Sequence, residues 1–189
     1  MHLLLLERDI FLIIMCSFFP SLIGLLICFC TDILFAQQPQ VKVFDVYQDL
    51  EAHVGQYAKS TVVINFWATY CGPCVQEIPY FDSLQQKYAR HNVKVILVSL
   101  DFRHHITERL MPFLNKHHLS TEVVLLADQD ADSWVSRVSA DWDGGLPFTL
   151  LMKQGQKYIH TSEFQDFNDL EQFAVPFIDP KQSLAAKRR

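Results

Sequence analysis

Residues 61–79 read TVVINFWATYCGPCVQEIP, and this stretch carries most of what decides the fold. Its first part, Thr61–Trp67, is a nearly continuous apolar run rich in β-branched residues, which is typical of a strand buried on both faces. From Cys74 to Arg90 apolar residues recur at helical spacing, so a helix is predicted there, with a kink at Pro79. Two cysteines therefore lie where a buried strand ends and a helix begins.

The placement of Cys71 and Cys74 suits reversible disulfide chemistry. Unpaired N–H groups and the dipole at a helix N-terminus favour a thiolate, which is the species that attacks a disulfide. Gly72 should permit the tight turn between the cysteines, and Pro73 sets φ for the first helical turn. We therefore expect Cys71 to attack a partner's disulfide and the more buried Cys74 to release the reduced partner.

Alternating strand and helix patterns continue on both sides of the cysteines. Before them, residues 41–47 alternate as a strand and residues 48–59 have helical spacing. After them, the patterns predict strands over 93–100, 122–127, 147–153 and 156–161, and helices over 106–117, 131–140 and 166–177. Such alternation predicts an α/β fold with a mixed, mostly parallel central sheet flanked by helices on both faces.

Composition limits the classes of protein that the chain can represent. Its 189 residues are half hydrophobic, which suits one compact domain with a proper core. A net charge of −5 gives no electrostatic footprint for nucleic acid. Of five cysteines, three lie before residue 31, so the two of the CGPC run have no other partners and a structural disulfide framework is excluded.

Residues 10–30 form an uncharged apolar run that is long enough to span a bilayer. Two interpretations stay open for residues 1–36, a cleaved signal peptide or a retained membrane anchor, and Met15 could be the true start. Either one would place the rest of the chain outside the cytoplasm, in the periplasm, as a soluble or a membrane-tethered domain. Residues 37–40 then read as a linker, 41–178 as one domain and 179–189 as a basic tail.

The cysteine pair could instead belong to a metal site. A structural zinc ion needs four ligands, usually two cysteine pairs or one pair with two histidines. Only one pair lies outside the N-terminal run, and the histidine doublets at 104–105 and 117–118 should each point apart on a regular element. We therefore expect surface histidines, no metal, and no cofactor other than the redox-active disulfide of the pair.

The run WATYCGPC at 67–74, with Pro79 five residues after the second cysteine, resembles the active-site motif of the thioredoxin superfamily. A second landmark, GGLPFT at 144–149, is similar to the loop that carries the family's cis-proline. The resemblance implies a thioredoxin fold in which this loop faces the sulfurs and offers main-chain hydrogen bonds to a bound peptide. It also implies that the residues contacting a client are Trp67, Tyr70, Gly72, Pro73, Leu146 and Pro147.

Within the superfamily the chain resembles the extracytoplasmic TlpA/ResA-type group. Like that group, it has an N-terminal anchor or signal before the domain and an α/β insertion before the cis-proline loop, near residues 105–126. The predicted fold also includes an N-terminal strand and helix extension. Asn65 occupies the position at which thioredoxins themselves carry a buried acid, whereas Glu77 matches a glutamate of the ResA-type group. One helical turn after Cys74, a desolvated Glu77 would have a raised pKa and could shuttle the Cys74 proton.

Members of this group are mostly reductants, and some reduce apocytochrome c before haem attachment. A Gly-Pro pair between the cysteines favours a reducing potential, as in thioredoxin at about −270 mV. We therefore expect an enzyme, a monomeric protein-disulfide reductase that acts on exported clients and receives electrons from a membrane donor. Cytochrome c maturation is one candidate role.

Three alternatives use the same cysteines. A periplasmic oxidant or isomerase is disfavoured by the Gly-Pro pair, and copper-handling relatives usually space their cysteines by three residues. A peroxidase usually has a threonine three residues before its reactive cysteine, where this chain has Ala68. The acidic stretch 128–143, with Trp134 and Trp142, could shape client choice, but a solvated loop with two core anchors is the favoured interpretation.

Overall fold

The structure is a computed structural model that describes residues 41–179. The predicted signal peptide or anchor, the predicted linker, the alternative start at Met15 and the tail beyond residue 179 lie outside the described residues. None of the helices between residues 41 and 179 is long and apolar enough to cross a membrane.

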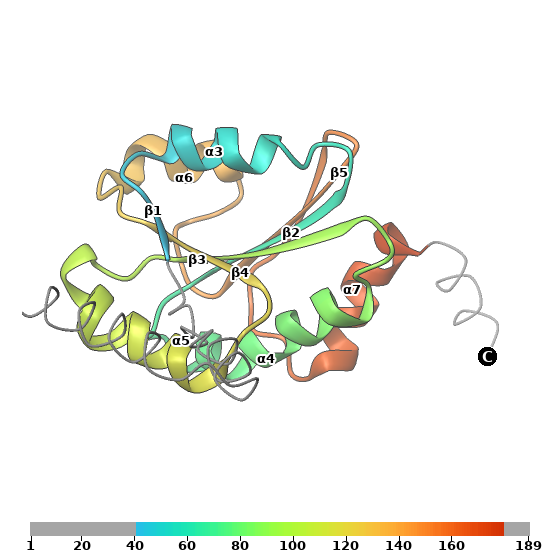
Figure 1. Ribbon diagram of the computed structural model, residues 1–189. Helices are drawn as coiled ribbons and strands as arrows, with labels where there is room; N and C mark the ends of the chain where they lie inside the picture. The colour runs from blue at the N-terminus through green and yellow to red at the C-terminus, as the bar shows by residue number, and fades with distance from the viewer. Residues whose placement is uncertain (1–40, 180–189) are drawn as a thin grey trace, which may run out of the picture. The chain divides into compact units, whose positions relative to one another are not determined.

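Six strands of this part form one sheet in the order β1-β4-β3-β2-β5-β6 (Figure 1). The first four strands in that order are parallel, and β5 and β6 are antiparallel to their neighbours. The bounds are Lys42–Phe44 (β1), Thr61–Trp67 (β2), Val93–Ser99 (β3), Glu122–Leu126 (β4), Phe148–Lys153 (β5) and Gln156–His160 (β6). The mixed, mostly parallel sheet is thus confirmed, and β2 has the bounds that its sequence predicts.

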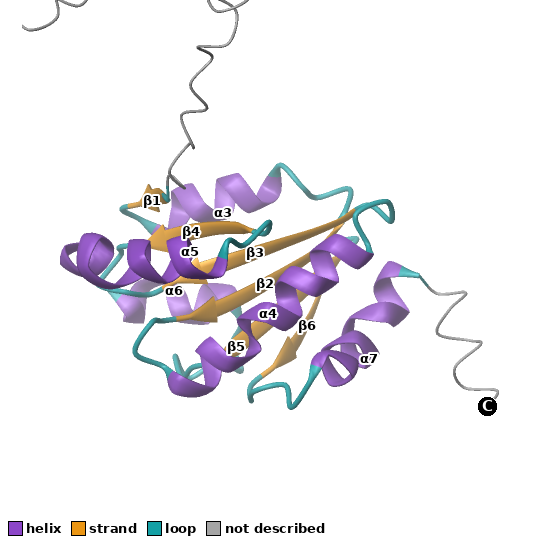
Figure 2. Cartoon of the chain, turned by 60° about the horizontal axis from the view of Figure 1, so that its bottom comes forward, coloured by secondary structure: helices purple, strands orange, loops and turns teal. Residues whose placement is uncertain are grey.

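Helices cover both faces of the sheet (Figures 1 and 2). One face packs against α4 (Gly72–Lys87), α5 (Met111–His117) and α7 (Phe167–Ile178), and the other against α3 (Tyr47–Gly55) and α6 (Ala131–Val138). Successive side chains of β2 serve the two faces in turn, because a strand alternates with a period of two. Val63 and Trp67 join the core beneath α4, whereas Val62, Ile64 and Phe66 join the core beneath α3 and α6.

The N-terminal strand is shorter than the predicted residues 41–47. β1 pairs only with β4, over Lys42 to Phe44, and the chain then turns into α3 at Tyr47. The Tyr47 N–H donates to the carboxylate of Asp128 at 2.9 Å. Because this N–H is bound to a side chain, it is not available to extend the strand ladder. The alternation of apolar residues along a strand does not show where its neighbouring strand ends, so it cannot predict the length of the paired segment.

The predicted helix over 106–117 is irregular in its first half. A 3-10 turn (Arg103–His105) and a π-helical turn (Ile106–Leu110) precede α5. Pro112, the second residue of α5, has no N–H to donate to the preceding turn, so regular α-helical hydrogen bonding is interrupted there. α4 begins at Gly72, two residues before the predicted start, and continues through Pro79.

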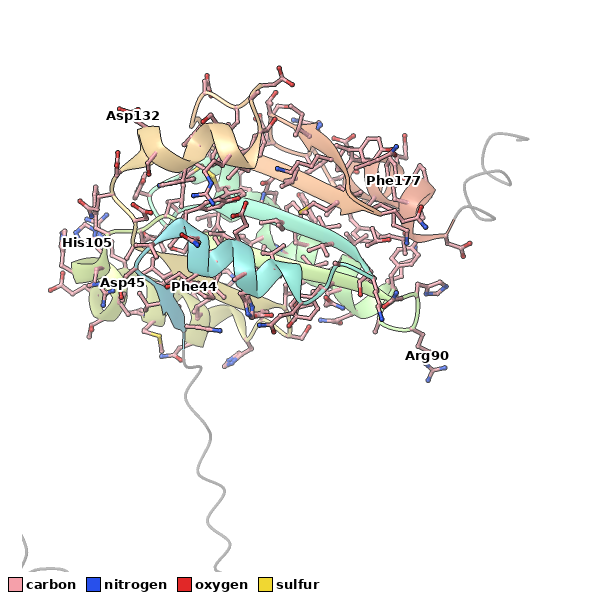
Figure 3. All side chains as sticks on the ribbon, turned by 90° about the horizontal axis from the view of Figure 1, so that it is seen from above. Phe44, Asp45, Arg90, His105, Asp132 and Phe177 are labelled. Atoms are coloured by element: carbon pink, nitrogen blue, oxygen red, sulfur yellow. A yellow bond between two sulfur atoms is a disulfide. The ribbon has the colours of Figure 1, made fainter. Side chains whose placement is uncertain are left out.

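The carboxyl ends of the parallel strands meet at one edge of the sheet. Figure 3 labels Asp45 and His105, which follow β1 and β3, at one end of the molecule and Arg90, which precedes β3, at the other. Because β2 is parallel to β3, the loop from Trp67 to Cys71 leaves the sheet at the same edge as His105. The cysteines are therefore presented at the carboxyl edge of the sheet.

Candidate active site

Cys71 and Cys74 form a disulfide at the start of α4, with 5.2 Å between their Cα atoms. Cys71 is the N-cap residue of the helix, and its Sγ accepts the Cys74 N–H at 3.3 Å. Cys71 is half-buried, whereas Cys74 is 0% exposed and belongs to the core. Cys71 can therefore react with a cysteine of a partner protein, whereas Cys74 is sheltered in the core.

Gly72 and Pro73 occupy the first turn of α4 and are exposed, as expected for the two residues between the sulfurs. A Cβ added at Gly72 would meet no atom within 4 Å, and the residue does not adopt a positive φ. The predicted steric reason for glycine is therefore wrong, because a helical conformation with open space accommodates any L-residue.

Glu77 lies one turn beyond Cys74 and is 0% exposed. Its Oε1 accepts from Asn65 Nδ2 at 2.8 Å, and its Oε2 accepts from the Phe164 N–H at 2.9 Å. Loss of solvent on burial raises the pKa of Glu77 from 4.5 to about 7, against the opposing effect of these two hydrogen bonds, and the nearby Glu163 adds to the rise. A carboxyl group with a pKa near neutrality thus lies inside the protein, on α4 one helical turn after the buried cysteine.

Asn65 links the carboxyl group of Glu77 to the sheet. Its Nδ2 also donates to Thr149 Oγ1 at 3.1 Å, because Asn65 in β2 is the register partner of Thr149 in β5. Its buried Oδ1 has no hydrogen-bond partner in the part of the chain that the structure describes. An amide cannot act as a base, as predicted for Asn65. Its hydrogen bond instead positions the carboxyl group of Glu77, which can act as a base.

Asp101 supports the loop before Cys71, and sequence reasoning missed it. It is 1% exposed and accepts the Thr69 N–H at 3.0 Å, the Thr69 hydroxyl at 2.5 Å and the Ser99 hydroxyl at 2.7 Å. Thr69 lies two residues before Cys71, so a buried carboxylate fixes the loop that carries the half-buried cysteine. The sequence could have indicated its position, because Asp101 closely follows a buried strand whose carboxyl end lies beside that of β2.

The GGLPFT segment is confirmed as a cis-proline loop, because the Leu146–Pro147 bond is cis. Phe148 pairs with Phe66 in the β2–β5 register, so the residues just before Phe148 lie next to the end of β2. Pro147 is buried and Leu146 is half-buried. The loop therefore borders the segment that leads from the sheet to Cys71.

The two remaining residues predicted to contact a client, Tyr70 and Trp67, differ in their exposure to solvent. Tyr70 is 55% exposed and lies directly before Cys71, and its pKa is raised by burial of part of the ring and by the charge of Asp101. Trp67, in contrast, is 0% exposed, and its ring lies 5.0 Å from that of Phe113 in α5. The structure places Trp67 in the core under the site rather than on the surface that a client would touch.

The histidine doublets do not all behave as predicted. The rings of His104 and His105 lie 4.1 Å apart, because these residues form a 3-10 turn and not the regular element on which they would point apart. Within residues 41–179, no group of three or more histidine, cysteine, aspartate or glutamate side chains is arranged to hold a metal ion.

Comparisons with known proteins agree with this arrangement. The family model described as Redoxin matches residues 37–152. The thiol-disulfide oxidoreductase ResA of Halalkalibacterium halodurans is 27% identical over 129 residues, which cover 67% of this chain and 68% of that protein. ResA of Oceanobacillus iheyensis is 48% identical over 40 residues, and this shorter match covers 21% of each chain.

Solved structures show the same fold. A putative thiol:disulfide interchange protein DsbE from Chlorobium tepidum superposes with a TM-score of 0.54 at 26% identity, over 66% of this chain and 84% of that one. A secreted thiol-disulfide isomerase from Corynebacterium glutamicum has a TM-score of 0.55 at 14% identity, over 67% and 75% of the chains, and shows the fold alone. The thioredoxin fold, the cysteine pair and the relatives agree on thiol–disulfide oxidoreductase chemistry. The chain therefore belongs to the Redoxin family, within the TlpA/ResA-type group of the thioredoxin superfamily.

Proposed function

We propose that this protein is a disulfide reductase that works outside the cytoplasm and reduces disulfides of exported client proteins. The observation that carries the proposal is the unequal exposure of the two sulfurs, with Cys71 half-buried at a helix N-terminus and Cys74 fully buried. Such a pair has one sulfur that can form a bond with a client and a second that can break that bond from inside the protein.

The cycle moves two electrons to the client. The Cys71 thiolate attacks one sulfur of the client disulfide, a new S–S bond joins the two proteins, and the other client sulfur leaves as a thiolate. Cys74 then loses its proton and attacks Cys71, which releases the first client sulfur. The client ends as a dithiol, and the enzyme ends in the disulfide form that the structure describes.

Glu77 is the group that takes the Cys74 proton in this scheme. It is buried one helical turn away from Cys74, and its pKa of about 7 leaves a substantial fraction ionised at neutral pH. A general base works best when its pKa lies near the working pH. The carboxylate form accepts the proton in the second step, and the carboxyl form returns it when the enzyme is reduced again.

The place of action and the electron source rest on the sequence. The uncharged run at 10–30 supports an exported or membrane-anchored chain. In an oxidising compartment such as the periplasm, a dithiol must be regenerated, and a membrane protein that delivers cytoplasmic electrons would do this. The cysteines of apocytochrome c are one candidate client, by resemblance to the TlpA/ResA-type group.

The redox potential of the full-length protein tests the direction of the reaction. The protein is equilibrated in graded dithiothreitol buffers and alkylated, and the peptide that contains both Cys71 and Cys74 is quantified by mass spectrometry. Measuring this peptide by itself keeps the three other cysteines out of the result. A potential at or below about −240 mV is expected for a reductase, whereas a value of about −120 to −180 mV would replace it with an oxidant or isomerase.

A further inference from the structure

Both polar main-chain groups of Gly145 are bound by side chains of its own loop. The indole N–H of Trp142 donates to the Gly145 C=O at 2.8 Å, and Asp143 Oδ1 accepts the Gly145 N–H at 2.9 Å. Gly144, between them, has a φ of 87°, in the region that favours glycine. The main chain that leads into Leu146 is therefore held from both sides.

Trp142 ties this loop to the two strands that border the active site. It is 5% exposed, and its ring stacks on Phe148 of β5 with centroids 4.3 Å apart and an angle of 14°. It also lies 4.8 Å from the ring of Phe66 in β2. The indole therefore cannot shift without disturbing the strands, which makes its N–H a fixed donor for the loop.

Leu146, the next residue, has an unpaired main chain. The β2–β5 pairing ends at Phe66 and Phe148, and neither the N–H nor the C=O of Leu146 has a hydrogen-bond partner within residues 41–179. Unpaired main-chain groups beside a strand can bind an extended peptide as an added strand. Such an arrangement is useful only when the groups are held in one orientation before the peptide arrives.

We propose that Trp142 is a positioning residue for client recognition, which holds the Leu146 main chain in register through its hydrogen bond to Gly145. The inference rests on the proposed disulfide exchange at Cys71. It predicts that the reaction of a disulfide carried on an extended polypeptide, whose main-chain groups next to the cysteine are free, depends on Trp142. A small disulfide without a peptide chain would gain nothing from Trp142.

Trp134 is a tryptophan of the same core that does not bind the cis-proline loop. It is 3% exposed, belongs to the same aromatic cluster, and donates its indole N–H to the C=O of Asp128 at 3.3 Å, in a different loop. Substituting either tryptophan by phenylalanine keeps an aromatic ring in the cluster and removes one N–H donor to a main-chain carbonyl. Trp134→Phe is therefore the matched control for Trp142→Phe.

The test compares three activated disulfides with the reduced full-length protein. The first is a short peptide whose internal cysteine is joined by a disulfide to thionitrobenzoate, and the second is the same peptide N-methylated at the residues on both sides of that cysteine. The third is Ellman's reagent, which has no peptide chain. Attack by Cys71 on the probe releases coloured thionitrobenzoate, and the Cys71→Ser protein gives the background from other cysteines.

The wild-type protein should react about threefold to tenfold faster with the first peptide than with its methylated form, as expected for one or two hydrogen bonds. Trp142→Phe should lose most of this preference, while Trp134→Phe keeps it and Ellman's reagent reacts at a similar rate with all three proteins. Asp143 is exposed, and Asp143→Ala removes the acceptor for the Gly145 N–H, so this variant should lose part of the preference. If Trp142→Phe does not fold, Asp143→Ala tests whether the held Gly145 main chain matters for the peptide, and an unchanged preference would count against the inference.

Three results would overturn the inference: a wild-type protein without the preference, a Trp142→Phe protein that retains it, or a Trp134→Phe protein that loses it equally. A failure of the proposed function looks different. In that case the wild-type protein would release no more thionitrobenzoate than Cys71→Ser from any of the three probes.

Discussion

Replacing Glu77 by glutamine should stabilise the folded protein more at pH 8 than at pH 5.5. Burial raises the pKa of Glu77 to about 7 in the folded protein, against 4.5 as its ordinary value. Because the folded pKa is the higher one, the stability associated with the protonated carboxyl group is complete below about pH 4.5 and is lost as the pH rises through about 7. Glutamine has no such titration.

The size of the effect follows from the two pKa values. Each unit of difference corresponds to about 1.36 kcal/mol between the protonation states. Relative to a permanently neutral group, ionisable Glu77 lowers the free energy of unfolding by about 1 kcal/mol at pH 5.5 and by about 3 kcal/mol at pH 8. The difference in stability between Glu77→Gln and the wild-type protein should therefore change by about 2 kcal/mol between these pH values.

Urea unfolding of both full-length proteins at the two pH values measures this change. The disulfide is kept intact, so that titration of Cys71 and Cys74 does not contribute, and any constant effect of altered hydrogen bonds to Asn65 or Phe164 cancels in the comparison. Glu108→Gln, an exposed glutamate in the π-helical turn, is the control and should show no comparable change. A stability difference for Glu77→Gln that is the same at both pH values would refute the raised pKa.

Two further predictions concern the loop and the proton transfer. Glu77→Gln should slow the release of a client from its mixed disulfide with Cys71 by about 100-fold, as for loss of a general base. It should also remove the rise in that rate near pH 7, which rapid-quench measurements against pH would show; an unchanged profile would exclude Glu77 as the base. Asp101→Asn should lower the free energy of unfolding by about 1–3 kcal/mol, because donors of Thr69 or Ser99 lose their acceptor. Denaturant unfolding beside the exposed Asp132→Asn control checks this, and equal effects of the two changes would contradict it.

The parts of the site that could be predicted are encoded by neighbours along the chain. The bounds of β2 follow from one apolar run, and the position of Cys71 at a helix N-cap follows from the residues next to it. The burial of Glu77 follows from helical spacing relative to Cys74, together with the family resemblance. In each of these cases the deciding interaction spans a strand or a single helical turn.

The parts that could not be predicted depend on residues far apart in sequence. Asp101 binds Thr69 across 32 residues, and Thr149 meets Asn65 across 84. Trp142 could be assigned to the core from its residue type, but nothing in the local pattern indicated that its N–H is directed at Gly145. The direction of a side-chain donor depends on the final course of the loop, which is set by how β2 and β5 pair.

By itself the sequence determined the class of sheet, mixed and mostly parallel, because strand patterns alternate with helix patterns along the chain. It also determined the redox pair, because two cysteines at a helix N-terminus need only local geometry. Tertiary structure decided the chemistry around that pair. The pKa of Glu77 and the anchoring of Thr69 by Asp101 arise from solvent exclusion and hydrogen bonds that exist only once distant segments have packed together.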